Sequence, residues 1–305
     1  MSAVGSRARR SASFLRPGSG LLILPPAVWV LAVLVAPIVL IGLYSFNLKT
    51  NLLGVPTAFS TANWKDFLPP GPNPFWDRFK ISMTITLVVS VITVVAAYPL
   101  AYFLAFVAGK RRYALLMVLL APFFTSYLLR VIAWEVILNN HGVINSLLWD
   151  LGLRTRGDGI PWLIYSKFSV GLVLFYSWVP FVSLPIFAML ENMDHRLLEA
   201  AEDLGASKWS TFWRITFPLS LPGVIAGFVF VLIPTTGEFI APLLVGGPDN
   251  QLFGNSIQAF FGSTPNWNFG SVLAMTLIVV VVVLMLIFGR FLNTDLRSTA
   301  GGRGA

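Results

Sequence analysis

Uncharged hydrophobic stretches alternate with polar connections along most of this chain. A helix that crosses the hydrocarbon core of a bilayer needs about 20 apolar residues. Stretches of this length lie at roughly 21–46, 81–109, 113–134, 168–190, 217–238 and 270–292. Each isolated span must satisfy its backbone hydrogen bonds internally, so all six are predicted to be helices. The pattern therefore predicts an all-α polytopic membrane protein with six transmembrane helices.

Prolines interrupt these hydrophobic stretches in several places. They stand at positions 37, 99, 122, 180, 185, 222 and 234, within or near the expected spans. Neighbouring helices in a membrane bundle can satisfy the carbonyl groups that a proline leaves free. We therefore expect kinks or breaks at these positions rather than helix ends.

The composition supports a membrane-embedded chain. Hydrophobic residues make up 56% and charged residues 11%, with a mean hydropathy of +0.78, which excludes a water-soluble core as the main design. The absence of cysteine excludes disulfides, thiolate metal sites and cysteine nucleophiles. The first hydrophobic stretch is too long for a signal peptide, so we expect an uncleaved first span. The expected organisation is a tail at 1–20, a membrane domain at 21–292 and a tail at 293–305.

The net charge of +8 suggests nucleic acid or anionic lipid as a partner. In a membrane protein, however, Lys and Arg collect in cytoplasmic loops and set the orientation. An arrangement with the N-terminus inside places 13 basic residues in the cytoplasm and 8 outside. This count predicts that both termini are cytoplasmic, and it favours the lipid bilayer over nucleic acid as the partner.

The connection at about 191–217 gathers charged and aromatic residues between two hydrophobic spans, and the same orientation makes it cytoplasmic. Asp194 can cap a helix with apolar residues at helical spacing, and Gly205 stands where that helix would end in a left-handed residue. Ser207 can cap a second short helix. That helix would carry an aromatic face of Trp209, Phe212 and Trp213. The pattern predicts a helix, a sharp turn and a helix; a pair of helices lying on the lipid surface is the structural alternative.

The order of residues in this connection resembles a known motif. Glu199-Ala200-Ala201 is followed after three residues by Gly205, after nine more by Ile215 and after one more by Phe217-Pro218. This order resembles the EAA loop of type I ABC importer permeases, which ends in Leu-Pro rather than Phe-Pro. "PFFTSYLLRVIAWEVIL" at 122–138 and "TTGEFIAPLLVGGPDNQLFGNSI" from Thr235 are similar to permeases of the spermidine and putrescine group.

The resemblance implies a non-catalytic membrane subunit in a bacterial inner membrane. A second homologous permease, two ATPase subunits and an extracytoplasmic binding protein would complete the transporter. The residues implied to contact an ATPase are Glu199, Ala200, Ala201, Gly205, Trp209, Phe212 and Trp213. This chain lacks a phosphate-binding loop: Gly109-Lys110 is followed by Arg111 rather than Ser or Thr, and Leu104 stands where the first glycine of the motif would be. ATP and Mg²⁺ would therefore be used by the ATPase.

No resident cofactor or metal is expected in this chain itself. His141 and His195 each stand outside any cluster with metal-ligand spacing. No arrangement of serine, histidine and acid suggests intrinsic catalysis, so a membrane enzyme is disfavoured.

Ionisable residues near a bilayer are costly and mark a path or a partner. Arg130, Glu135 and Glu238 are expected at a similar outer depth, at the ends of the third and fifth spans. One hypothesis places Glu238 on a path for a cationic solute, with Tyr176 and Trp178 offering aromatic faces to ammonium groups. The alternative is that Glu238 pairs with Arg130 and only fastens two helices.

The resemblance implies putrescine or spermidine as the solute, while relatives with other cationic, amino or opine-like solutes look alike at these motifs. A rival function is a self-contained secondary transporter or channel with Glu238 as its coupling carboxylate. Such proteins often have inverted repeats, which the sequence does not show. They would also not need the Glu-Ala-Ala loop.

Overall fold

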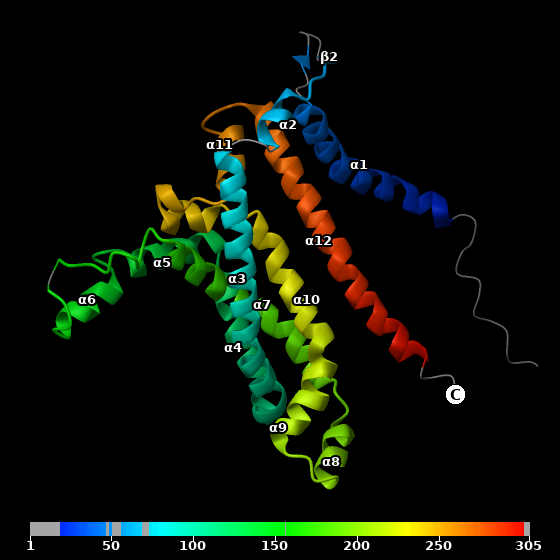
Figure 1. The fold of residues 1–305 in the computed structure, drawn as a ribbon. Helices are drawn as coiled ribbons and strands as arrows, with labels where there is room; N and C mark the ends of the chain where they lie inside the picture. The colour runs from blue at the N-terminus through cyan, green and yellow to red at the C-terminus, as the bar shows by residue number, and fades with distance from the viewer. Residues whose placement is uncertain (1–18, 47–48, 51–55, 69–72, 156, 302–305) are drawn as a thin grey trace, which may run out of the picture.

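The computed structural model describes residues 19–46, 49–50, 56–68, 73–155 and 157–301. Over these ranges the regular secondary structure is helical apart from a short antiparallel hairpin of β1 (Lys49–Thr50) and β2 (Pro56–Ala58). The hairpin lies in a connection, above the helices in the view of Figure 1. The predicted all-α membrane architecture is confirmed, with this hairpin as a minor addition.

The long helices are α1 (Ser19–Ser45), α3 (Pro74–Tyr102), α7 (Lys167–Glu191), α10 (Phe217–Thr236) and α12 (Trp267–Gly301). The shorter ones are α2 (Ala62–Phe67), α4 (Arg112–Leu120), α5 (Tyr127–Leu138), α6 (Val143–Asp150), α8 (His195–Asp203), α9 (Lys208–Thr211) and α11 (Phe253–Phe261). Wider π-helical turns occur at η1 (Phe103–Val107), η4 (Phe212–Thr216) and η5 (Pro242–Gly246). Short 3₁₀ turns are η2 (Gly109–Arg111), η3 (Ala121–Phe124) and η6 (Pro248–Asn250).

Five helical segments in the described ranges are long and apolar enough to cross a bilayer, and a bent pair of segments makes a sixth candidate. The bent pair contains the third expected span, 113–134, and turns by 87° between Phe124 and Tyr127. Pro122 lies in the 3₁₀ turn just before the bend, and Thr125 is extended with ψ of 157°. Proline removes a backbone donor and favours such an interruption. The third span is therefore broken, as the proline indicated.

Helices α3, α7 and α10 pack against one another and form the centre of the molecule (Figure 1). Two glycines let α10 approach α7 closely. A Cβ atom on Gly223 would lie 2.6 Å from the carbonyl oxygen of Pro185, and one on Gly227 would lie 3.0 Å from Val182 Cγ1. The small-residue spacing of Gly223 and Gly227 thus belongs to the contact between these two helices.

Buried hydroxyl groups connect the central helices across the bundle. Thr86 Oγ1 donates to the carbonyl oxygen of Thr235 over 3.3 Å, and Tyr98 and Ser220 share a hydrogen bond of 2.9 Å. Each such bond contributes on average about 0.6 kcal/mol in a membrane bundle. These bonds fix α3 against α10 at two depths.

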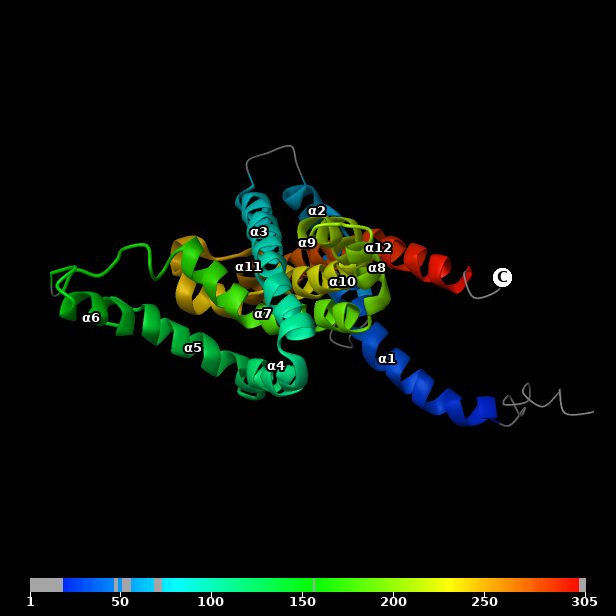
Figure 2. The same cartoon turned by 90° about the horizontal axis from the view of Figure 1, so that it is seen from below.

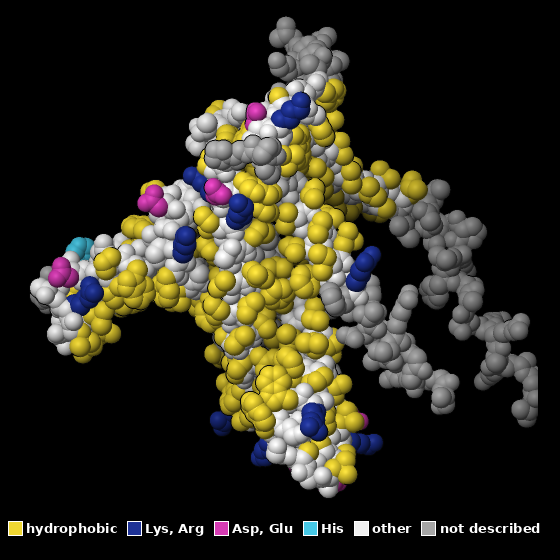
Figure 3. Space-filling view, viewed as in Figure 1, with side chains coloured by type: hydrophobic (Ala, Val, Ile, Leu, Met, Phe, Trp, Pro, Cys, Tyr) yellow, Lys and Arg dark blue, Asp and Glu magenta, His cyan; other side chains and the backbone are white. Residues whose placement is uncertain are grey.

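The remaining long helices lie beside the centre. Helix α12 packs against α10, α11 and α1. Helix α1 is exposed from Leu24 to Leu40, becomes buried towards Ser45, and leans away from the bundle (Figures 1 and 2). On the opposite side, α5 and α6 extend outward. Figure 3 shows a broad hydrophobic surface over the bundle, with Lys and Arg side chains around the end that carries α8 and α9.

Candidate functional site

The connection between α7 and α10 folds into the predicted helix, turn and helix. Asp194 Oδ1 accepts a hydrogen bond from the backbone N–H of Arg196 over 3.0 Å and caps α8. At the other end Gly205 has φ of +77°, and the backbone N–H of Ala206 donates to the carbonyl oxygen of Ala201 over 3.0 Å. A left-handed residue here favours glycine because it has no Cβ. Both predicted helix boundaries are confirmed.

The second half of the loop is more continuous than the sequence suggested. Ser207 Oγ accepts from the backbone N–H of Ser210 over 3.3 Å, which confirms the predicted cap. Helix α9 does not end there as a separate short helix. It runs through η4 into α10, so that Lys208–Thr236 is one helical segment of 29 residues. Any force on α9 therefore acts directly on a membrane helix.

The aromatic residues of the loop form a cluster with an exposed side and a buried side. Trp209 is 73% exposed and Trp213 is 48% exposed. Phe212 stacks against Trp209 but is half-buried, with its ring 5.7 Å from that of Tyr98 on α3. The two tryptophans thus face outward, while Phe212 anchors the loop to the bundle.

The Glu-Ala-Ala segment lies on α8. Glu199 and Ala200 are exposed, and Ala201 is buried against the rest of the loop. Over the described ranges the ion pairs are Lys80 with Asp77 and Arg112 with Glu191, so the Glu199 carboxylate is not engaged in one. An exposed carboxylate beside a small side chain leaves room for a closely approaching partner.

A polar contact that the sequence did not predict holds α4 to the end of α7, next to this loop. Arg112 Nη2 lies 3.0 Å from Glu191 Oε1, and the Tyr113 hydroxyl donates to the same carboxylate. The sequence contained a signal for this contact. Glu191 is the first acidic residue after a long uncharged span, and the basic run Lys110–Arg112 is predicted on the same side of the membrane. The contact ties the α4 end of one interhelical connection to the end of α7.

A pocket of about 380 Å³ lies between α5, α7 and the break that follows α10. Three of the candidate path residues line it: Arg130, Trp178 and Glu238. Tyr127 and Ser177 also line it, although the sequence analysis did not select them. The position of Tyr127, three residues before Arg130 on the same helix face, was a usable signal.

Glu238 and Arg130 lie in this pocket without forming an ion pair. Glu238 Oε1 accepts hydrogen bonds from the backbone N–H groups of Ile240 over 2.7 Å and Ala241 over 3.2 Å. The guanidinium carbon of Arg130 instead lies 4.2 Å from the centre of the Phe123 ring. The alternative in which these two charges only fasten two helices is not observed in the described residues. The bend places Arg130 over an aromatic face, and backbone donors occupy Glu238 Oε1.

The other two candidates do not line the pocket. Tyr176 packs edge-on against Trp134 with a ring distance of 5.3 Å, and Glu135 lies further along α5. Several buried polar atoms around the pocket have no hydrogen-bond partner among the described residues. They are Ser177 Oγ, Trp178 Nε1 and Arg130 Nε and Nη1. The pocket therefore combines a carboxylate, a guanidinium and uncommitted polar atoms with aromatic walls.

The helical membrane fold and the α8–α9 loop indicate a transporter subunit, and comparison with known families identifies which kind. The chain belongs to the family described as binding-protein-dependent transport system inner membrane component, which it matches over residues 2–298. It is a multi-pass permease subunit of an ABC importer. In this family the permease is non-catalytic and a separate ATPase hydrolyses ATP. This membership excludes the self-contained secondary transporter.

Among individual relatives, the spermidine/putrescine permease PotB of Escherichia coli K12 is 33% identical over 262 residues, covering 86% of this chain and 93% of PotB. The permease YdcU of the same organism is 30% identical over 283 residues, covering 88% of each chain. PotB of Haemophilus influenzae is 34% identical over 209 residues, covering 68% of this chain and 72% of that protein.

Solved structures of ABC transporters share the fold. A bacterial transporter for the import of alginate superposes with a TM-score of 0.69 at 19% identity, covering 90% of this chain and 94% of the other. Another structure of an alginate transporter, with a TM-score of 0.65 at 17% identity, is a complex with an alginate-bound periplasmic protein, and the match covers 88% and 91% of the two chains. The MetNI methionine transporter matches with a TM-score of 0.54 at 12% identity, covering 72% and 95%.

Proposed function

We propose that this chain forms half of a translocation path for a polyamine, putrescine or spermidine. A second homologous permease would supply the other half, two cytoplasmic ATPase subunits would bind ATP and Mg²⁺, and an extracytoplasmic binding protein would deliver the solute. The extensive match to PotB supports the polyamine. The count of basic residues supports cytoplasmic termini and a cytoplasmic α8–α9 loop.

The observation that carries the mechanism is the continuity of α9, η4 and α10. Glu199, Ala200, Trp209 and Trp213 offer an exposed surface on this loop. On the proposed mechanism, ATP binding closes the ATPase pair and draws the two loops together. Because α9 continues through η4 into α10 without leaving the helical conformation, the membrane helix moves with the loop. The importer then passes from inward-facing to outward-facing as a population shift between two packings.

The pocket beside Glu238 is the proposed point of contact with the solute. The Glu238 carboxylate attracts an ammonium group, and Trp178 and Tyr127 present aromatic rings on which such a group binds. Arg130 lines the same pocket with the opposite charge, so the net attraction for a cation is small. A weak site suits a permease, because a solute must leave it as readily as it enters.

Uptake of labelled spermidine by proteoliposomes that contain the complete copurified complex tests this proposal. Glu238→Gln removes the charge and keeps the shape, and we expect uptake to fall roughly tenfold or more, because hydrogen bonds to charged groups contribute about 1.5–3 kcal/mol. Glu135→Gln is the matched control outside the pocket and should transport normally. Unchanged uptake and cation preference in Glu238→Gln would refute the path assignment. Competition by putrescine and by other cationic or opine-like solutes identifies the substrate.

A further inference from the structure

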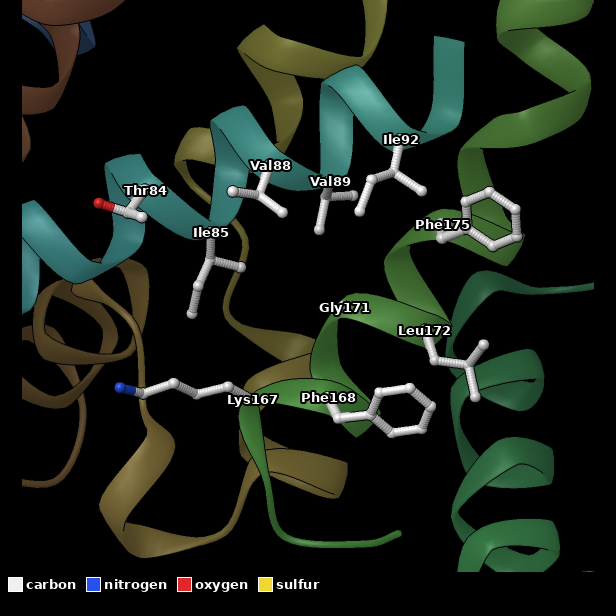
Figure 4. A pocket seen from close by; sticks show the side chains of 10 residues that line it. All are labelled: Thr84, Ile85, Val88, Val89, Ile92, Lys167, Phe168, Gly171, Leu172 and Phe175. Carbon is white, nitrogen blue, oxygen red and sulfur yellow. The ribbon is translucent and has the colours of Figure 1, made fainter. Parts of the chain in front are cut away.

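A second hollow lies between α3 and α7, on a different face of α7 from the pocket that contains Glu238. Its volume is about 510 Å³. Figure 4 shows Thr84 and Lys167 at one end and Ile92 and Phe175 at the other. From Thr84 to Ile92 the groove follows α3 for about 12 Å at 1.5 Å per residue.

The walls of this groove are almost entirely aliphatic and aromatic. Its lining consists of Thr84, Ile85, Val88, Val89, Ile92, Lys167, Phe168, Gly171, Leu172 and Phe175. Gly171 lines the groove without a side chain, and a Cβ at this position would project towards Val89 Cγ2 at the ordinary van der Waals distance of 3.7 Å. A long, narrow, apolar groove between two membrane helices has the shape and polarity of an acyl chain.

Lys167 supplies a charge at one end of this apolar groove. Its side chain is exposed, and the ion pairs found over the described ranges do not include it. It is also the first residue of α7, and the first turn of that helix has no acidic residue. The N-terminus of a helix carries a partial positive charge, so a lysine there adds to the field rather than offsetting it. This end of the groove therefore attracts an anion.

Aromatic side chains locate this end near the membrane surface. Trp162 is 56% exposed and packs edge-on against Phe168, with a ring distance of 5.0 Å. Tryptophans collect at the level of lipid headgroups. The apolar groove matches an acyl chain, and the cation at its membrane-surface end matches a phosphate headgroup. The two features together fit an anionic phospholipid.

We propose that the α3–α7 groove binds one anionic phospholipid, with an acyl chain between the helices and the phosphate beside Lys167. A lysine near the membrane surface attracts an anionic lipid headgroup. The bound chain fills the groove between α3 and α7 and stabilises their packing around the bundle centre. This site is independent of the transported solute.

Native mass spectrometry of the complete complex, released from nanodiscs of phosphatidylcholine and phosphatidylglycerol in equal parts, tests the proposal. We expect one retained phosphatidylglycerol per copy of this chain. Lys167→Gln should weaken its retention about fivefold, from the loss of one lysine near a headgroup, whereas Lys167→Arg should keep it. Lys65→Gln, an exposed lysine on α2, is the matched control and should have no effect.

A second variant separates the acyl chain from the headgroup. Gly171→Leu fills the groove and should remove the retained lipid whatever its headgroup. Equal retention in Lys167→Gln and wild type would overturn the proposal. Crosslinking gives a second way to refute the proposal. Gly171→Cys introduces a cysteine into a chain that has none. The proposal fails if this cysteine crosslinks to the second permease and not to a photoreactive phosphatidylglycerol.

Discussion

Gly205 shows how one residue shapes the cytoplasmic loop. Its φ of +77° lies in the left-handed region, and it is exposed, so no neighbouring side chain limits the position. A substitution there changes the backbone preference of the turn without disturbing a packed core.

We expect Gly205→Val to destabilise the turn between α8 and α9 by about 1–2 kcal/mol. Solute uptake should fall, while the thermal stability of the membrane bundle changes little because the turn is outside it. Gly205→Asn is the control, since asparagine tolerates the left-handed region, and it should retain most transport. Equal uptake by the Val and Asn variants would show that the turn geometry does not matter for coupling.

At the same scale, the capping residues were predictable and the partners of the buried charges were not. Asp194 and Ser207 act through neighbours two or three residues away, so local sequence contains the information. Arg130 and Glu238 are separated by more than a hundred residues, and their surroundings depend on the 87° bend. Both were selected because charges in a bilayer are rare, but their actual contacts required the fold.

At the scale of elements, the contact between α7 and α10 depends on close approach. The Cβ of a residue at position 223 would lie 2.6 Å from the carbonyl oxygen of Pro185 and 2.7 Å from Met189 Cγ. The backbone oxygen cannot move without shifting α7. The packing of these two helices is therefore sensitive to side-chain volume.

Gly223→Leu should destabilise the purified complex by about 1–3 kcal/mol or more, the usual cost of overpacking. The measurement is the apparent Tm in detergent. Gly289→Leu on α12 is the matched control, because a Cβ at that position meets no atom within 4 Å. If both variants melted at the same temperature, the close contact of α7 with α10 would not limit stability.

The positions of the membrane helices were largely predictable, and their ends were less so. Hydropathy placed the second span at 81–109, but α3 begins at Pro74 and includes Asp77 and Lys80. Asn73 caps it by accepting a hydrogen bond from the backbone N–H of Phe75 over 2.9 Å. Hydropathy reports which residues sit in lipid, whereas capping decides where a helix begins. For the same reason the helical segment that contains α10 starts at Lys208.

At the scale of the whole molecule, one helical segment connects the loop to the pocket. Lys208–Thr236 spans about 43 Å at 1.5 Å per residue. Trp209 lies near its cytoplasmic end as we assign it, and Glu238 lies just beyond its other end. The α8 helix and its exposed Glu199 sit beside the first turns of this segment. A displacement of the loop can therefore reach the pocket through a single element.

The central claim is that this loop couples an ATPase to the membrane helices. The most direct test measures ATPase activity and labelled spermidine uptake together, in proteoliposomes containing the copurified complex. The variant is Glu199→Arg, which reverses an exposed charge on α8. Asp66→Arg is the control, with the same charge change at an exposed position on α2.

The account predicts that Glu199→Arg loses the ATPase from the complex, or retains it without uptake, while the membrane subunit stays folded and Asp66→Arg behaves as wild type. Undiminished ATP-dependent uptake by Glu199→Arg, with the ATPase still bound, would contradict it.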